Sequence, residues 1–372
     1  MRSPQTVVSM IGTRPNFMKM APVIRLLADH PDEFRQVVVH TGQHYDRAMS
    51  DVFLEQLGVG APDHMLGVGS GSHAAQTARI MDRLEPLLLD VAPDLVLVPG
   101  DVNSTLAAAL TAAKLGIAVG HVESGLRSFD RTMPEEINRM VTDQLSSLLF
   151  THSPEATGNL LREGCRESDI HLVGNTMIDT LVTMKERCDA LDAAGAHGLQ
   201  RGAYLVVTLH RPALVDGPLL RVALAQLELV AQSVPVIFPI HPRTRAAMKA
   251  AGLSAPSVLL AEPLGYLEFL SLVASARGVL TDSGGIQEET TYLGVPCYTL
   301  RDNTERPITC SVGTNILLGL DPMRISEIPE LLRHAEPGGR VPPLWDGRAA
   351  LRLVDVLREH AVGDSRLHIG LR

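Results

Sequence analysis

Residues 278–307 read GVLTDSGGIQEETTYLGVPCYTLRDNTERP, and this stretch decides the fold. The apolar run 279–281 predicts a short buried strand, Asp282 to Gly285 a tight turn, and 286–293 a helix that ends before Gly294. The first N–H groups of a helix have no partner within it, and the helix dipole is positive there, so such a turn favours anions. The stretch therefore predicts one strand–turn–helix unit of an α/β sheet with a phosphate or diphosphate site.

The side chains around this turn suit a nucleotide ligand. The Ser283 hydroxyl can add a donor to the backbone N–H groups, and Glu289 can accept from sugar hydroxyls. Arg301 and Arg306 follow the next predicted strand and supply cations for phosphate. An ordinary turn with Ser283 as helix N-cap is the alternative, and for the SGG triplet alone it is favoured. The acid and the two arginines favour the phosphate site.

The pattern of strand, loop and helix repeats on both sides of this stretch. Continuous apolar runs such as 94–98 are typical of parallel sheets, and functional groups in such sheets gather at the carboxyl ends of the strands. Three loops fall at such ends: GTRPN (12–16), PGDVNS (99–104) and HVESGLRS (121–128). We expect strands at 6–11, 35–40, 94–98, 117–122, 204–208 and 234–240. We expect helices at about 19–27, 46–57, 266–275 and 348–360, one more that ends near 115 and another that begins at about 217.

This alternation predicts two Rossmann-like α/β domains that face each other across a cleft. We expect the first domain at 1–186 and the second at 203–347, because the small residues of 186–202 dilute the hydrophobic pattern like a linker. The closing segment, 348–372, carries a helix that could pack back on the first domain. The glycine-rich run 67–72 (GVGSGS) is interpreted as a flexible loop that follows no strand, which weakens a nucleotide-fingerprint interpretation.

Composition excludes several kinds of partner. The chain has 372 residues, of which 45% are hydrophobic, 20% charged and 3% aromatic, with a net charge of -9. Few aromatic residues and a negative charge argue against a nucleic-acid groove. The four cysteines form neither a CxxC pair nor zinc spacing, so reduced thiols in a cytoplasmic protein are expected. The apolar run 7–11 is too short for a signal peptide or a membrane span.

Three acids sit at predicted strand ends of the first domain or just beyond. Asp101 could instead cap the following helix, Glu123 could pair with Arg127, and Glu135 could form a capping box with Thr132. Taken singly, each structural alternative is favoured, because ion pairs and caps outnumber catalytic acids. Helix caps and ion pairs do not require three acids at one rim of one sheet, so the three acids together predict a catalytic site.

His210 ends a predicted strand of the second domain and is followed by Arg211. A lone histidine is usually structural. This one could face the three acids across the predicted cleft, which makes it a further catalytic candidate.

The motifs of the whole chain match one family. GTRPNFMKMAP, TGQH, PGDVNST, GHVESGLRS, MPEEINR, VGNTMIDTL, TLHRP, HPRT, TDSGGIQEE and RDNTERP occur in that family's order. The chain resembles the non-hydrolysing UDP-N-acetylglucosamine 2-epimerases, whose fold is the two-domain GT-B type. The resemblance implies that Asp101, Glu123, Glu135 and His210 are catalytic, that Arg14, Lys19, Asp101, Glu123 and His210 contact the substrate, and that Phe269, Ser283, Gly284, Gly285, Glu289 and Arg306 hold the uridine diphosphate.

The reaction implied by the resemblance is an elimination followed by re-addition. A base removes the proton from the acetamido-bearing carbon while UDP leaves the anomeric carbon, and UDP then returns to give the manno isomer. Such chemistry needs acid or base groups on both faces of the sugar and cations for the leaving diphosphate. It calls for neither a redox cofactor nor a metal. The resemblance also implies a homodimer.

Several positions depart from the family pattern. Asn16 stands where many members have Glu, HRPALVDG replaces HRxEN, and Leu264 occupies a position that is often polar. These changes surround the sugar and leave open a 2,3-diacetamido sugar or its uronate as substrate. Some bacterial members bind a second UDP-sugar as activator, and Gln43, His44 and His241 fit that motif, although Asp46 and the loop 67–72 do not.

Two other function classes remain open from the sequence. A glycosyltransferase of similar fold would share the phosphate site but would need an acceptor site and no acids on both faces of the sugar. A non-catalytic sugar-nucleotide sensor could lose all three acids without harm. The presence of all three favours the epimerase.

Overall fold

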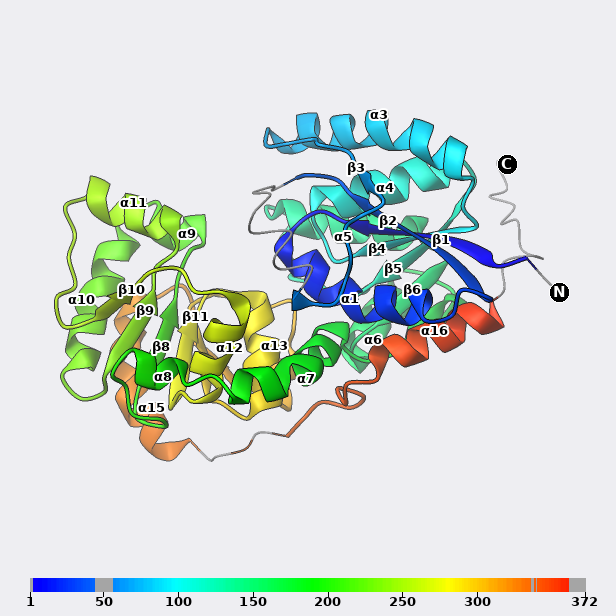
Figure 1. The fold of residues 1–372 in the computed structure, drawn as a ribbon. Coiled ribbons are helices and arrows are strands. Elements are labelled where there is room, and N and C mark those ends of the chain that lie inside the picture. The colour runs from blue at the N-terminus through cyan, green and yellow to red at the C-terminus, as the bar shows by residue number, and fades with distance from the viewer. Residues whose placement is uncertain (1–2, 44–55, 336–337, 339, 361–372) are drawn as a thin grey trace. The chain divides into compact units, whose positions relative to one another are not determined.

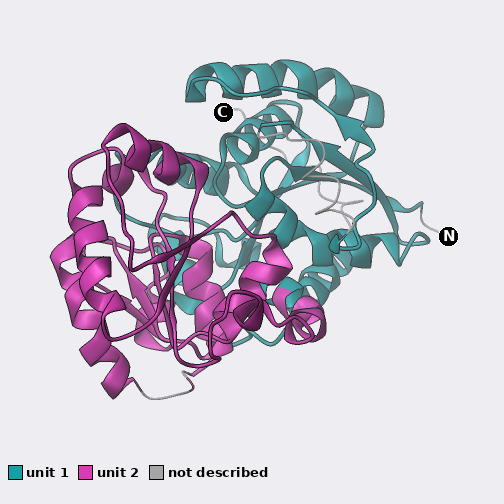
Figure 2. Cartoon of the chain, turned by 60° about the vertical axis from the view of Figure 1, so that its left-hand side comes forward, with its two compact units in different colours: residues 1–180, 343–372 teal, residues 181–342 magenta. Residues whose placement is uncertain are grey.

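The computed structural model describes residues 3–43, 56–335, 338 and 340–360. The chain divides into two compact units (Figure 2). Unit 1 comprises Met1–Thr180 and Pro343–Arg372, and unit 2 comprises Leu181–Pro342. Among the described helices, none is both long enough and apolar enough to cross a lipid bilayer.

Unit 1 is built on a parallel sheet whose described strands run in the order β3-β2-β1-β4-β5-β6-β7. Figure 1 shows α3 and α4 on one side of this sheet and α1 and α16 on the other. The strands are β1 (Gln5–Ile11), β2 (Phe34–His40), β3 (His64–Met65), β4 (Leu95–Pro99), β5 (Ala118–Val122), β6 (Leu148–Thr151) and β7 (Ile170–Leu172). The helices are α1 (Arg14–Ala28), α3 (His73–Val91), α4 (Asn103–Lys114), α5 (Pro134–Leu145), α6 (Pro154–Arg162) and α16 (Ala349–Glu359), with a 3-10 turn at Glu167–Asp169.

Unit 2 repeats the architecture with a parallel sheet in the order β10-β9-β8-β11-β12-β13. Its strands are β8 (Leu205–Thr208), β9 (Val236–Pro239), β10 (Leu259–Ala261), β11 (Gly278–Thr281), β12 (Cys297–Thr299) and β13 (Asn315–Leu317). Its helices are α8 (Ala193–Ala196), α9 (Pro212–Val215), α10 (Leu219–Ala231), α11 (Pro242–Ala250), α12 (Tyr266–Ala274), α13 (Gly284–Leu293), α14 (Ile308–Ser311) and α15 (Ile328–His334), with a 3-10 segment at Pro322–Glu327. Helix α7 (Thr176–Asp189) carries the chain from unit 1 into unit 2.

Helices cover both faces of each sheet, and the strand sequences reflect this. β4 reads LVLVP with every residue buried, as expected for a parallel strand without a solvent face. In unit 2, separate hydrophobic clusters contain Val207 and Leu280 on the one hand and Val206 and Val279 on the other, because successive side chains of a strand point to opposite faces. The predicted α/β class with parallel sheets is confirmed.

Strand order places a switch point in each sheet. In unit 1 it lies between β1 and β4, and in unit 2 between β8 and β11. Ligands of open α/β sheets bind outside the carboxyl ends of strands at such points. The segments to inspect are therefore those that follow β1, β4, β8 and β11.

Some local predictions differ from the structure. Helix α1 begins at Arg14 rather than near Lys19, since Pro15 suits the first turn and the side chain of Asn16 accepts the Thr13 N–H at 3.2 Å. The loop 67–72 does follow a strand, β3, which is only two residues long. The predicted helix 46–57 lies, up to residue 55, outside the described residues.

The segments joining the units have defined packing. The interval 186–202 contains α8, whose Ala193 and Ala194 are buried in the hydrophobic core of unit 2. After unit 2 the chain returns to unit 1, where α16 contacts α1 and Asp179 accepts the N–H groups of Ala349 and Ala350 at 3.0 and 2.7 Å. The buried Trp345 donates its indole N–H to the His152 carbonyl at 2.9 Å.

Candidate active site

Two of the predicted acids follow neighbouring strands of unit 1. β4 and β5 are paired in parallel with Pro99 opposite Val122, so Asp101 and Glu123 emerge from the same edge of the sheet. Between Pro99 and Asp101 stands Gly100, whose φ of +64° favours glycine. A Cβ atom at Gly100 would lie 2.7 Å from Lys19 Nζ, so the turn also needs glycine to admit that ammonium group.

Glu123 forms a buried ion pair with Lys19, which projects from α1. The side chains are only 7% and 6% exposed. The proposed pairing of Glu123 with Arg127 is wrong, because Arg127 lies 2.7 Å from Asp143 and 2.5 Å from Glu163. Glu123 also has a φ of +68°, a left-handed conformation that costs a non-glycine residue about 1–2 kcal/mol and is common at functional sites.

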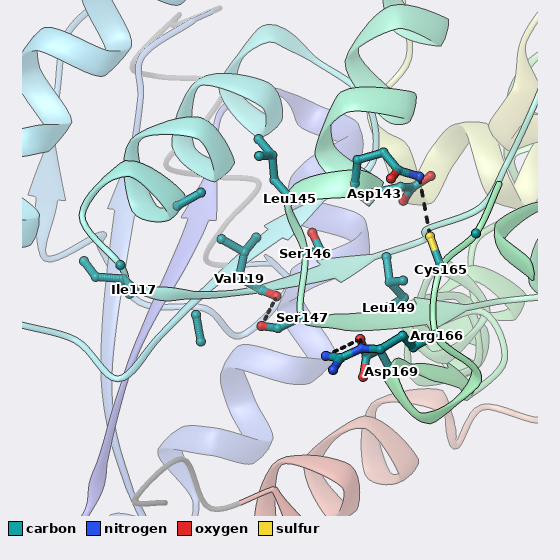
Figure 3. Close-up of a pocket in the computed structure, with 15 residues that line it drawn as sticks. Ile117, Val119, Asp143, Leu145, Ser146, Ser147, Leu149, Cys165, Arg166 and Asp169 are labelled. Carbon is teal, nitrogen blue, oxygen red and sulfur yellow. Dashed lines mark hydrogen bonds and ion pairs between the residues drawn. The ribbon is translucent and has the colours of Figure 1, made fainter. Parts of the chain in front are cut away.

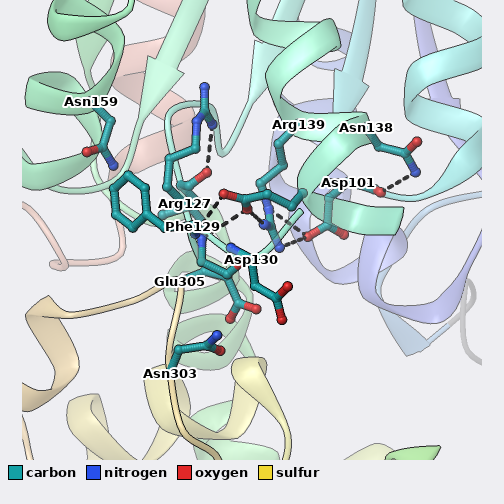
Figure 4. A network of polar contacts seen from close by, with 12 residues as sticks. Asp101, Arg127, Phe129, Asp130, Asn138, Arg139, Asn159, Asn303 and Glu305 are labelled. Carbon is teal, nitrogen blue, oxygen red and sulfur yellow. Dashed lines mark hydrogen bonds and ion pairs between the residues drawn. The ribbon is translucent and has the colours of Figure 1, made fainter. Parts of the chain in front are cut away.

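Asp101 is held by Arg139 on α5 (Figure 4). The guanidinium donates to one Asp101 oxygen through Nε at 3.0 Å and Nη2 at 2.6 Å, and Asn138 donates to the Asp101 carbonyl at 2.8 Å. The alternative of a helix cap is wrong, because Val102 is the N-cap of α4 and makes no side-chain capping bond. Each acid is therefore balanced by a cation from another part of unit 1.

The motif MPEEINR places two acids with different environments in the first turn of α5. Glu136 is buried, accepts the N–H groups of Ser128 and Phe129 at 2.9 and 2.8 Å, and lies 2.5 Å from Arg139. It is a structural residue that sequence reasoning did not single out. Glu135 is partly exposed, and its assignment as a catalytic acid stays a prediction.

The alternative capping box at Glu135 is wrong. Met133, not Thr132, is the N-cap of α5, and Thr132 instead bonds Asp130. Figure 4 shows Asp130 and Phe129 on the loop that precedes α5.

The remaining unit 1 predictions fall at the start of α1 and after β2. Arg14 is exposed at the first turn of α1. Gln43 is buried, and its side-chain oxygen accepts from the Ser104 N–H at 3.2 Å and hydroxyl at 2.7 Å. His44 lies outside the described residues. The assignment of Gln43 and His44 to an activator site, and of Arg14 to the substrate, therefore stays a prediction.

In unit 2, the predicted phosphate site begins α13. Ser283 occupies the N-cap position, but its hydroxyl makes no capping bond, so the alternative of an ordinary capped turn is wrong in this respect. The Arg306 guanidinium lies against Gly284, where a Cβ atom would meet Arg306 Nη1 at 2.6 Å. Glycine is thus needed to seat a cation beside the helix N-terminus, an arrangement that suits a diphosphate.

Carboxylates hold the Arg306 guanidinium in place. Glu288 lies 2.9 Å from Nε and Glu305 lies 3.4 Å from Nη1. Arg301, which we expected to face phosphate, donates instead to both oxygens of Glu305 at 3.0 and 2.6 Å. The arginines therefore form one chain of ion pairs in which Arg306 lies next to the glycine turn.

Two further predicted nucleotide contacts lie on neighbouring helices. Glu289 is buried on α13, and Phe269 is half-buried on α12, where it packs against a hydrophobic cluster that includes Ile286. Their roles toward the uridine and its ribose stay predictions.

His210 follows β8 and is oriented by Asp282, which follows β11. His210 Nδ1 lies 3.0 Å from one Asp282 oxygen, and the other oxygen accepts the N–H groups of His210 and Arg211, each at 2.7 Å. Burial raises the pKa of Asp282, but the His210 ring and these N–H donors outweigh it and hold the pKa below its usual range. Sequence reasoning missed Asp282, although its position directly after a strand was a usable signal.

His241 lies beside this pair, with its ring 5.5 Å from that of His210. Burial, followed by the neighbouring His210, lowers the pKa of His241. The contact places one predicted activator residue next to a predicted catalytic residue within unit 2.

A separate pocket of about 340 Å³ lies in unit 1 at the amino ends of β5 and β6 (Figure 3). It reaches Val119 at the start of β5, whereas Glu123 follows the end of that strand. Its cysteine, Cys165, accepts from Gln144 at 3.6 Å, and burial raises the pKa of the thiol. The pocket is therefore distinct from the predicted active-site edge. All four cysteines of the chain are free thiols, as expected from their spacing.

Comparison with known proteins identifies the family. A family model described as UDP-N-acetylglucosamine 2-epimerase matches residues 27–358. A UDP-N-acetylglucosamine 2-epimerase of Methanococcus maripaludis is 41% identical over 358 residues, which cover 93% of this chain and 96% of that protein. A UDP-2,3-diacetamido-2,3-dideoxy-D-glucuronate 2-epimerase of Pseudomonas aeruginosa is 39% identical over 318 residues, covering 84% and 88%.

Solved structures support the same conclusion. The crystal structure of Methanocaldococcus jannaschii UDP-GlcNAc 2-epimerase in complex with UDP-GlcNAc and UDP is 40% identical, covers 95% of this chain and 100% of that chain, and superposes with a TM-score of 0.86. Together with the two parallel sheets, this confirms the predicted two-domain fold of GT-B type. The chain therefore belongs to the UDP-N-acetylglucosamine 2-epimerase family, as its motifs predict.

Proposed function

We propose that this protein converts UDP-N-acetylglucosamine reversibly into UDP-N-acetylmannosamine. The observation that carries the proposal is the pair of acids, Asp101 and Glu123, at adjacent strand ends, each balanced by a cation. The cradle formed by the α13 N-terminus and Arg306 supplies the matching diphosphate site. The similar proteins are named UDP-N-acetylglucosamine 2-epimerases, which supports the same substrate class and an isomerase activity.

The reaction proceeds by elimination of UDP and its re-addition. A carboxylate removes the proton at the acetamido-bearing carbon, the electron pair of that C–H bond forms the ring alkene, and the bond to UDP breaks. UDP returns to the 2-acetamidoglycal while a proton is delivered to its other face. Asp101, Glu123 and Glu135 are the groups available for these two proton transfers.

The roles are divided between the units. In unit 2, Ser283, Gly284, Gly285 and Arg306 hold the diphosphate, while Phe269 and Glu289 contact the nucleoside. The His210 ring, oriented by Asp282, stabilises the leaving group. In unit 1, Arg14 and Lys19 contact the substrate beside the acids. The residues need no cofactor or metal for this chemistry.

A related UDP-2,3-diacetamido sugar or its uronate is the second candidate substrate. The similarity to the Pseudomonas aeruginosa protein favours it, and so do the sugar-site departures at Asn16 and Leu264. Incubation of the protein with a panel of UDP-sugars, monitored by NMR of the anomeric protons, distinguishes the two candidate substrates. Faster turnover of the diacetamido uronate than of UDP-N-acetylglucosamine would replace our first assignment.

Incubation in heavy water tests the reaction itself. The proton that is returned to the other face comes from a group that has exchanged with solvent, so the product should carry deuterium at the acetamido-bearing carbon and nowhere else on the ring. UDP and the glycal should also be released slowly when an intermediate escapes. A glycosyltransferase or a sensor gives no deuterium there. Manno product without deuterium and without glycal would refute elimination.

We also propose activation by a second UDP-sugar, with Gln43, His44 and His241 as the candidate residues. The assignment rests on the motif and on the contact of His241 with His210. Sigmoidal dependence of the rate on UDP-sugar that becomes hyperbolic in His241→Ala supports it. A hyperbolic wild-type curve over a wide concentration range contradicts it.

We also infer a homodimer that uses exposed apolar side chains of α5 and α6. Ile137 and Val141, which are one turn apart on α5, are 50% and 39% exposed, and Leu161 on α6 is 44% exposed. Val141→Asp should turn the dimer into a monomer in sedimentation velocity. Leu89→Asp, at an exposed position of α3, is the matched control and should not. A wild-type monomer at micromolar concentration would refute the inference.

We place the protein in the cytoplasm. The four free thiols support a reducing compartment, since oxidising compartments favour disulfides.

A further inference from the structure

A buried histidine lies behind the two acids of unit 1. His121 is on β5, and its side chain is fully buried. Its Nδ1 lies 2.6 Å from an Asp143 oxygen, and its Nε2 lies 2.7 Å from the Gly100 carbonyl oxygen. Both ring nitrogens are therefore engaged, one on each side of the ring.

The partners determine which atoms carry the protons. The Gly100 carbonyl can only accept, so Nε2 must donate. The second Asp143 oxygen lies 2.7 Å from Arg127 and accepts the Gly125 N–H at 3.2 Å. A guanidinium and an N–H donor at that oxygen favour the ionised carboxylate. Asp143 is thus an acceptor, and Nδ1 must donate as well.

Charge balance agrees with a ring that carries both protons. The charged groups around His121 are Asp143 on α5, Arg127 after β5 and Glu163 after α6, which binds Arg127 at 2.5 Å. With an imidazolium at His121, two cations face two carboxylates. With a neutral ring, the cluster would hold an excess negative charge that is largely buried, which is unfavourable.

The bond from His121 fixes the turn that carries Asp101. The Gly100 N–H donates to the Val122 carbonyl at 2.9 Å, and the Gly100 carbonyl accepts from His121. Both polar groups of Gly100 are thus attached to β5, the strand that directly precedes Glu123. We propose that His121 is a buried imidazolium and a positioning residue, which holds Asp101 and Glu123 at a fixed separation. This role rests on the proposed epimerase function.

Nitrogen NMR of histidine-labelled wild-type protein tests the protonation state directly. The His121 signals are assigned by their absence in His121→Gln. We expect two protonated ring nitrogens for His121 at pH 7, because both nitrogens face acceptors. A signal from an unprotonated His121 nitrogen at this pH overturns the proposal, and the measurement needs no catalysis.

Two substitutions test the positioning role. The His121→Gln amide reaches the place of Nε2 and can still donate to Gly100, whereas the His121→Asn amide reaches only the place of Nδ1. We expect kcat to fall about 100-fold in His121→Asn and less than about 10-fold in His121→Gln, with KM and the Kd for UDP within about 2-fold of wild type in both. Equal loss of kcat in the two variants, or loss of UDP binding, overturns the role.

These outcomes remain separate from the proposed function. If wild-type protein does not epimerise any UDP-sugar, the proposed function and the positioning role fail together, and the NMR measurement still decides the charge of His121. If His121→Asn does not fold, the wild-type spectrum and the His121→Gln kinetics decide the proposal.

Discussion

Removal of the Lys19 ammonium should destabilise unit 1 strongly. In Lys19→Met the apolar stem is kept while the cation that balances Glu123 is lost. Both side chains are more than nine-tenths buried, so water cannot replace the lost charge. Breaking one partner of a buried ion pair typically costs about 3–5 kcal/mol.

An upper limit follows from the chemistry of the carboxyl group. A glutamate that cannot stay charged can take up a proton, and at pH 7 this costs about 3.7 kcal/mol for a carboxyl of ordinary pKa near 4.3. We therefore expect a loss of about 3–4 kcal/mol in the free energy of unfolding at pH 7. At pH 5 protonation costs only about 1 kcal/mol, so the loss should shrink as the pH falls.

The chain offers its own probe for this measurement. It has one tryptophan, Trp345, which is buried and belongs to unit 1, so its fluorescence reports the unfolding of that unit. Urea denaturation at pH 7 and pH 5 gives the two free energies. Lys114→Met is the matched control in the same unit, because Lys114 is exposed and should change stability by less than about 0.5 kcal/mol.

A double variant completes the test. Lys19→Met combined with Glu123→Gln removes both charges and should recover part of the lost stability, since no buried charge is left without a partner. A loss below about 1 kcal/mol in Lys19→Met at pH 7, or a loss that does not depend on pH, would refute the buried ion pair as we describe it.

The remaining predictions concern the two units separately. Gly284→Ala should push Arg306 from the glycine turn and raise the Kd for UDP about 10- to 150-fold, and an unchanged Kd by calorimetry would contradict the cradle. Asp282→Asn should lower kcat about 100-fold with UDP binding intact, because His210 loses its orienting carboxylate; unchanged kcat would make that contact merely structural. Asp179→Ala should lower the stability of unit 1 by about 2 kcal/mol in urea denaturation, because the start of α16 loses two hydrogen bonds to a carboxylate, and an unshifted tryptophan transition would argue against that cap.

The sheets could be predicted because their strands are continuous apolar runs. β4 was predicted within one residue of its bounds, whereas the two-residue β3 was missed, since so short a segment shows no periodicity. The sequence pattern predicts the start of α1 too late because Arg14 and Pro15 resemble a loop, although proline is favoured in the first turn of a helix. The small residues of α8 are typical of a linker, yet tertiary packing buries Ala193 and Ala194.

The position of the acids could be predicted, but their partners could not. Asp101 and Glu123 follow strands, and parallel strands bring their carboxyl ends to one edge. Lys19 and Arg139 lie far away in sequence, and only folding brings them beside these acids. The sequence suggests Arg127 as a nearer partner for Glu123. In the structure, Arg127 instead forms ion pairs with Asp143 and Glu163.

The return of residues 343–360 to unit 1 has a consequence for biosynthesis. Unit 2 is one uninterrupted segment, whereas unit 1 needs α16, which is made after all of unit 2. As the chain leaves the ribosome, unit 2 can therefore finish folding while unit 1 still lacks a helix, the reverse of the usual N-terminal-first order. Until α16 arrives with its apolar residues Leu353, Val354 and Leu357, the nascent unit 1 leaves part of α1 uncovered. Chaperones that bind exposed apolar surface should therefore engage this half of the nascent chain for longer than the half that is made later.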